Sequence, residues 1–132
     1  MDRLAFDSEA ILAFYLGEAG GETVRDLLQK IQNGEAEGYM NLLNLAEICY
    51  ILCRLDPALA EEKQRNLRLY GLKIVPIADN GLWREAAQIK SKHAMSLADA
   101  FAVATAQACN ATLVVGRDEE FNGIDVQLMR IR

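Results

Sequence analysis

Short apolar runs alternate along the chain with longer stretches in which apolar residues recur every three or four positions. The short runs predict strands, and the longer stretches predict helices that pack against them. We expect strands near residues 4–6, 38–42, 72–77, 113–115 and 126–129, and helices near 8–16, 22–33, 45–55, 57–70, 82–93 and 96–109. Continuous apolar strands separated by helices are typical of a parallel sheet covered on both faces. The pattern predicts an α/β fold, a three-layer α/β/α domain with a mostly parallel sheet of about five strands.

A few polar residues and one proline indicate where helices begin. Asp79 and Ser96 are suitable N-caps, and Pro57 suits the first turn of a helix. Two helices are predicted between the third and fourth strands. The pattern therefore does not tell at which end of the sheet the second of them begins.

Composition and charge narrow the possible functions. The length of 132 residues favours one domain, 1–132, and the hydrophobic content of 52% is that of a globular protein. Lys and Arg number 14 against 19 Asp and Glu, a formal charge of −5. This balance argues against a protein held on nucleic acid by bulk positive charge, although a local basic groove remains compatible with it.

The cysteines and the lengths of the apolar runs indicate the cellular compartment of the protein. Cys49 and Cys53 fall within an apolar helical pattern and are expected to be buried thiols, and Cys109 leaves an odd number. No disulfide framework is expected, which favours a reducing cytoplasm. The N-terminus does not have the pattern of a signal peptide, and carboxylates interrupt every apolar run before 18 residues. We expect a cytoplasmic protein without a membrane partner.

Two aspartates closely follow predicted strands. Asp7 comes directly after the first strand, and Asp118 follows the fourth. The carboxyl ends of strands line the functional crevice of open α/β sheets. A structural role is also open to each, because Asp7 can cap the next helix and Asp118 can be a turn residue. Their shared position makes them candidates for one site.

Two further carboxylates stand near the starts of apolar helices. In the segment LADAFAVATA only Asp99 and Thr105 are polar, and a helix that is apolar all round is buried. A carboxylate on such a helix is costly unless a cation or several donors compensate it. Glu47 repeats the pattern in an earlier helix. A capping box remains open for both, as Ser96-x-x-Asp99 and Asn44-x-x-Glu47.

The four carboxylates are candidates for one cation site. Carboxylate oxygens suit Mg²⁺ or Mn²⁺ better than zinc. The chain has a single histidine, His93, which excludes a histidine-rich zinc site. The sequence therefore predicts an Mg²⁺ or Mn²⁺ centre formed by Asp7, Glu47, Asp99 and Asp118.

The segments that carry these residues also have a recognisable order and spacing. They are AFDSEAIL, MNLLNLAEICYIL, SLADAFAVATAQ and VVGRDEEF, which together reach from the first strand nearly to the last. In these segments the chain resembles the PIN-domain family, and within it the VapC-type toxins of bacterial and archaeal toxin–antitoxin pairs. The resemblance implies that the four carboxylates are both the catalytic residues and the metal ligands of a ribonuclease.

The resemblance extends to neighbouring positions and also shows departures. Ser8 matches a small hydroxyl residue, Asn44 a supporting polar residue, and Glu120 a second acidic position near Asp118. Gly116 stands where the family usually has Ser or Thr, and Glu9 replaces a small or amide residue. These departures concern the fine tuning of the site.

The implied function is that of a divalent-metal-dependent endoribonuclease leaving a 5′-phosphate and a 3′-hydroxyl. An acidic cluster alone would repel the phosphodiester, so cations are needed to reverse the local charge. The implied partners are RNA, a cognate VapB-like antitoxin and a second copy in a homodimer. Candidate phosphate contacts are Arg117 first, then Arg3, Lys90 and Lys92. Trp83 can stack on a base, but its helical spacing reads more simply as a core-facing anchor.

Two other functions remain open. One is a PIN nuclease of RNA processing without a toxin role. The other is a non-catalytic module that binds Mg²⁺ or a partner, such as a receiver-like domain. A receiver should have an acidic pair after its first strand and a lysine after its last. Here Ser8 follows Asp7, and the last strand leads to Arg130 and Arg132.

Overall fold

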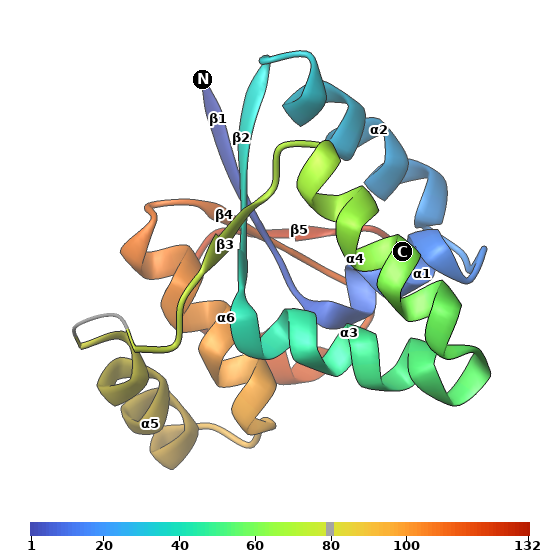
Figure 1. Cartoon of the computed structure of the whole chain (residues 1–132). Helices are drawn as coiled ribbons and strands as arrows, with labels where there is room; N and C mark the ends of the chain where they lie inside the picture. Colours follow the sequence, from blue (N-terminus) through green and yellow to red (C-terminus); the bar gives the residue numbers. More distant parts are fainter. Residues whose placement is uncertain (79–80) are drawn as a thin grey trace.

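A five-stranded parallel sheet lies at the centre of the computed structural model, which describes residues 1–78 and 81–132 (Figure 1). The strand order is β3-β2-β1-β4-β5, and all four pairings are parallel. The strands are β1 (Asp2–Phe6), β2 (Ala36–Asn41), β3 (Lys73–Val75), β4 (Thr112–Val115) and β5 (Leu128–Arg130). The predicted α/β fold and its number of strands are confirmed.

Helices cover both faces of this sheet. They are α1 (Ser8–Tyr15), α2 (Gly21–Gln32), α3 (Leu42–Leu55), α4 (Pro57–Leu69), α5 (Leu82–Lys92) and α6 (Leu97–Ala108). On β1, Leu4 and Phe6 belong to a core with α1 to α4, while Ala5 belongs to a core with α5 and α6. The alternation of side chains along one strand thus divides the interior into two cores and gives the three layers.

The order of the strands reverses between β1 and β4. From β1 the chain builds the sheet outward through β2 and β3, then crosses back to place β4 on the other side of β1. Phe6 pairs with Val114, and the Asp7 amide donates to the Val114 carbonyl oxygen at 3.2 Å. The two strands therefore end side by side at a topological switch point, where α/β proteins bind ligands.

Helix α3 begins earlier than the sequence pattern predicts. The expected second strand extends to residue 42, whereas the strand ends at Asn41 and the helix begins at Leu42. The cause is a cap: the Asn41 side chain accepts from the Leu43 amide at 2.8 Å. Asn44 is therefore inside the first turn, and the proposed capping box from Asn44 to Glu47 is wrong.

Two buried contacts hold the layers together. The Asn41 side chain donates from Nδ2 to Thr105 Oγ1 at 3.1 Å, and this hydroxyl donates to the Phe101 carbonyl oxygen at 2.7 Å. Gly38 in β2 lies beneath Ile31 of α2 and Leu72; a Cβ there would come within 2.8 Å of Leu72 Cδ1. The absence of a side chain at 38 lets α2 approach the sheet.

Two expectations about buried residues are wrong. Trp83 is 50% exposed, because the buried face of α5 is formed by Leu82 and Ala86; its ring instead lies 5.3 Å from the Arg84 guanidinium. Cys53 is exposed, since the α3 stripe buries Ile48 and Leu52 instead. The Asp79 cap falls outside the described residues. Within those residues, no helix is long and apolar enough to cross a membrane.

Candidate metal centre

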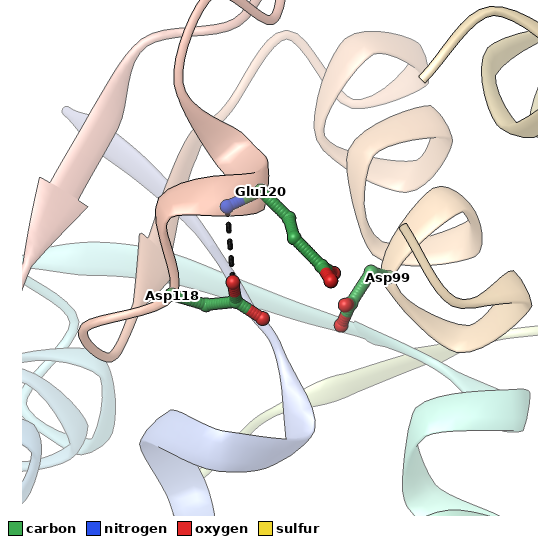
Figure 2. A group of neighbouring side chains, drawn as sticks. All are labelled: Asp99, Asp118 and Glu120. Atoms are coloured by element: carbon green, nitrogen blue, oxygen red, sulfur yellow. Dashed lines mark hydrogen bonds between the residues drawn. The ribbon is translucent and has the colours of Figure 1, made fainter. Parts of the chain in front are cut away.

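Three carboxylates from two distant segments meet at the carboxyl edge of the sheet. Asp99, Asp118 and Glu120 each offer one oxygen, and these oxygens lie within 4.8 Å of one another. Figure 2 shows the Glu120 and Asp118 side chains directed toward Asp99 across the gap between the loop and α6. Two of the three, Asp99 and Asp118, belong to the predicted set of four, and Glu120 was expected only to support it. Helix α6 thus begins at the carboxyl end of the sheet, which settles the question left open by the sequence.

Local hydrogen bonds orient each member of this cluster. The Asp118 carboxylate accepts from the Glu120 amide at 2.9 Å through Oδ1 and so starts the 3₁₀ turn Glu119–Phe121 (Figure 2). The Ser96 hydroxyl accepts from the Asp99 amide at 3.1 Å and caps α6. The turn role predicted for Asp118 and the N-cap predicted for Ser96 are therefore confirmed. They also leave carboxylate oxygens available, because an ionised carboxylate can accept several hydrogen bonds.

Asp7 is the most buried of the four predicted carboxylates and is not among the three that cluster. It is 1% exposed, and its Oδ1 accepts from the Ala10 amide at 2.8 Å, which makes it the N-cap of α1. Burial raises the pKa of Asp7 well above its usual value, the Ala10 hydrogen bond opposes this, and the charges of Asp99, Glu9 and Glu47 raise it further. A buried carboxylate that other carboxylates repel is stabilised by a cation.

Burial and neighbouring carboxylates also raise the pKa of Asp99, which is half-buried. Loss of hydration raises the pKa of Asp99 to about 6, against a hydrogen bond with Ser96, and repulsion from Asp118, Glu120 and Glu47 adds to the rise. The field of Glu47 thus reaches both Asp7 and Asp99. Glu47 itself is half-buried on α3 and stands outside the tight three-residue cluster.

Ser8 and Asn44 connect the helices that begin around the site. The Ser8 hydroxyl donates to the Asn44 carbonyl oxygen at 3.2 Å, and Asn44 Nδ2 lies 3.3 Å from that hydroxyl. Asn44 Nδ2 also donates to the Ala98 carbonyl oxygen at 3.0 Å. Both residues are buried. The N-terminal turns of α1, α3 and α6 are thereby fixed to one another.

Gly116 and Glu9, the two departures from the family pattern, lie against each other. A Cβ at 116 would overlap the Glu9 carboxyl group and come 2.6 Å from Oε2. The Glu9 carboxylate is held there by Arg132, whose Nη2 lies 2.6 Å from Oε1. The Arg132 side chain is 18% exposed. The space of a side chain at 116 is therefore filled by Glu9, a pairing that neither position shows alone in the sequence.

The basic residues proposed to contact RNA differ in how close they lie to the acidic cluster. Arg117 is exposed on the loop that carries Asp118, beside the cluster. Arg3 lies near the amino end of β1, at the opposite edge of the sheet, where it donates to the Tyr39 hydroxyl at 2.8 Å. Lys90 donates to the Met95 carbonyl oxygen at 3.0 Å. Of these, Arg117 is best placed beside the acidic site.

The residues present fit a hard divalent cation. The donors are carboxylate oxygens, two of them from half-buried residues, and burial together with their mutual repulsion raises the pKa of Asp99. Mg²⁺ and Mn²⁺ prefer such oxygen ligands. Asp99, Asp118 and Glu120 can bind the ion directly, with Asp7 and Glu47 close enough to act on it electrostatically.

Comparison with known proteins agrees with this architecture. The sequence model for the PIN domain matches residues 4–127. VapBC2 from Rickettsia felis, bound to a DNA fragment from their promoter, has a similar chain with a TM-score of 0.74, 18% identity and coverage of 97% and 98% of the two chains. A toxin–antitoxin complex from Klebsiella pneumoniae gives 0.72 at 16% identity, covering 98% of each chain.

A third similar structure is FitAcB from Neisseria gonorrhoeae, with a TM-score of 0.69 and 21% identity over 97% of both chains. At these identities the structures establish the shared fold. No curated protein matches the chain in sequence.

Proposed function

Since the chain belongs to the PIN-domain family, we propose that it is a divalent-metal-dependent endoribonuclease, the toxin of a type II toxin–antitoxin pair. The observation that carries the proposal is the convergence of Asp99, Asp118 and Glu120 within 4.8 Å at the switch point of the sheet. Cations would stabilise such a cluster of carboxylates, and they would also allow an anionic phosphodiester to approach it.

The site residues have distinct roles in this proposal. Asp99, Asp118 and Glu120 would hold Mg²⁺ or Mn²⁺, and Asp7 and Glu47 would act on the ion electrostatically from nearby. A bound divalent ion supplies charge neutralisation of the phosphate and activation of water. Asp7 also positions the start of α1, and Arg117 is the contact proposed for an RNA phosphate.

The toxin role rests on the family and on the similar folds. The structures named above include a toxin–antitoxin complex and VapBC2, and we propose a VapB-like antitoxin and a second copy of the chain as partners. A short antitoxin reading frame beside the gene would favour the toxin over an RNA-processing nuclease. The cytoplasm is the proposed place of action, because RNA is the proposed substrate.

Cleavage of RNA in the presence of Mn²⁺ tests the enzymatic part directly. We expect the wild-type protein to cut RNA with Mn²⁺ and to stop when EDTA is added. Asp99→Asn should lose the activity, because the amide removes one charge and one ligand oxygen from the cluster. Asp125→Asn is the matched control: it makes the same chemical change at an exposed residue before β5, at the opposite edge of the sheet.

Circular dichroism would verify that both variants are folded. Equal cleavage by Asp99→Asn and the wild type would show that the site is misassigned. Mn²⁺ binding without RNA cleavage by the wild type would instead support the non-catalytic module.

A further inference from the structure

We propose that Arg130 is a positioning residue, which holds the loop bearing Asp118 and Glu120 in the arrangement that binds the cation. The inference rests on the proposed metal site and adds a residue outside its acidic set. It concerns residues 116–122, which leave the sheet after β4 and carry two of the three clustered carboxylates.

This loop has few attachments of its own. It leaves the sheet at Val115, and Phe121, which is 0% exposed, inserts into the core at the other end. Between these anchors lie three consecutive acidic residues, Asp118 to Glu120, of which Asp118 and Glu120 cluster with Asp99. Like charges at these separations repel, so the loop requires a restraint that keeps its carboxylates near α6.

Arg130 supplies such a restraint from the neighbouring strand. In the β4–β5 ladder Arg130 pairs with Val115, so its side chain starts where the loop departs. Its Nη1 donates to the Asp118 carbonyl oxygen at 2.8 Å and to the Gly116 carbonyl oxygen at 3.3 Å. Its Nη2 donates to Asn122 Oδ1 at 2.6 Å. One guanidinium thus binds the beginning, the middle and the end of the loop.

The groups that accept hydrogen bonds from Arg130 leave the clustered carboxylates available to a cation. Arg130 binds two backbone carbonyls and one side-chain amide, whereas an arginine paired with the Asp118 or Glu120 carboxylates would compete with a metal for the same oxygens. The loop is fixed while its carboxylates stay available. Lysine cannot replace this arrangement, because a single ammonium lacks the planar fork that reaches three separate acceptors.

If Arg130 positions the loop, its removal should change metal affinity in the opposite direction from that expected if only its charge matters. Removal of a positive charge close to a cation site should strengthen cation binding if charge alone matters. Loss of a positioning contact should weaken it, and residues that support metal ligands typically account for about 10–100-fold in affinity. The sign of the change therefore distinguishes the two roles.

The test is calorimetric titration of the purified full chain with Mn²⁺ alone, so that the readout is affinity and not cleavage. We expect Arg130→Met to bind Mn²⁺ at least about 10-fold more weakly than the wild type. Arg130→Lys should fall between them, since it keeps the charge and loses the fork. Arg117→Met is the matched control: Arg117 lies on the same loop and forms no hydrogen bond or ion pair with the described residues. Its affinity should stay the same or rise.

Unchanged or stronger binding by Arg130→Met would overturn the proposal, as would an equal loss in Arg117→Met. Thermal unfolding in EDTA checks that the variants are folded, and Arg130→Lys carries the test if Arg130→Met is not. The outcome is separable from the proposed function through Asp99→Asn. Wild-type binding that Asp99→Asn abolishes supports the metal site whatever Arg130 does, and a wild type that binds no Mn²⁺ overturns both proposals.

Discussion

The contact between Glu9 and Gly116 allows a sharp test of how this structure is packed. A methyl group at 116 would overlap the Glu9 carboxyl, so Gly116→Ala forces Glu9 to move away. The moving carboxylate leaves Arg132, with which it forms a 2.6 Å ion pair. Arg132 is mostly enclosed, and its Nε is already buried without a hydrogen-bond partner among the described residues. The cost of Gly116→Ala should therefore depend on the residue at position 9.

The magnitude follows from two opposing contributions, the lost ion pair and the reduced entropy of the unfolded chain. Exposed ion pairs contribute about 0–1 kcal/mol and breaking buried ones costs about 3–5 kcal/mol, so this half-enclosed pair should contribute roughly 1–2 kcal/mol. Alanine lowers the entropy of the unfolded chain by about 0.4–1 kcal/mol, and Gly116 has no left-handed φ that would oppose it. We expect Gly116→Ala to destabilise the wild type by about 1 kcal/mol, which corresponds to roughly 4 °C in Tm.

A double-mutant cycle by urea denaturation in EDTA measures this dependence. In the Glu9→Ala background the clash is gone, and Gly116→Ala should stabilise the protein by about 0.5 kcal/mol. The coupling free energy should therefore be about 1–2 kcal/mol. Glu18→Ala is the control background, because Glu18 also lies near Arg132, at 3.9 Å, without filling the space at 116. There Gly116→Ala should still destabilise. The same effect of Gly116→Ala with and without Glu9 would refute the reasoning.

Three further predictions follow from the site and the core. The raised pKa of Asp99, about 6, means that the folded metal-free protein holds this proton more tightly than the unfolded chain. The free energy of unfolding in EDTA, measured with urea, should therefore fall as the pH rises from about 4 to about 6. Mn²⁺ affinity, measured by calorimetric titration, should increase over about pH 5 to 7. An affinity independent of pH would contradict the assignment of Asp99 as a metal ligand. Gly38→Ala should destabilise by about 1–3 kcal/mol in urea, since its methyl group meets Ile31, and Ile31→Val should reduce that cost. Thr105→Val should cost about 1–3 kcal/mol because Asn41 Nδ2 loses its acceptor; a thermal melt unchanged by this substitution would contradict the buried hydrogen bond.

Much of the fold was accessible from periodicity. Strand and helix positions were predicted to within a few residues because apolar runs and stripes report burial directly. The start of α3 was missed because one cap decided it: Asn41 ends the strand and begins the helix, and no periodic signal distinguishes it from Asn44. Trp83 was misplaced because its spacing with Ala86 puts it next to the buried face, but Leu82 and not Trp83 fills the core there.

The sequence predicted most of the acidic residues of the site, but not which of them lie in the tight cluster. Asp99 and Asp118 were identified by their places near a helix start and after a strand, and the structure brings them together. Glu120 lies in the tight cluster instead of at its edge because the 3₁₀ turn directs its side chain toward Asp99 (Figure 2). Arg130 and the contact of Glu9 with Gly116 were beyond the sequence, since both depend on which strand lies beside β4.

The joined N-terminal turns of α1, α3 and α6 have a consequence for the stability of the acidic site. Each turn presents the positive end of a helix dipole to the acidic site, and Ser8 and Asn44 keep the three ends together. The carboxylates are thus partly compensated by the backbone itself, whether or not an ion is bound. The stability of the folded chain should therefore depend less on a bound ion than the acidic cluster alone would suggest.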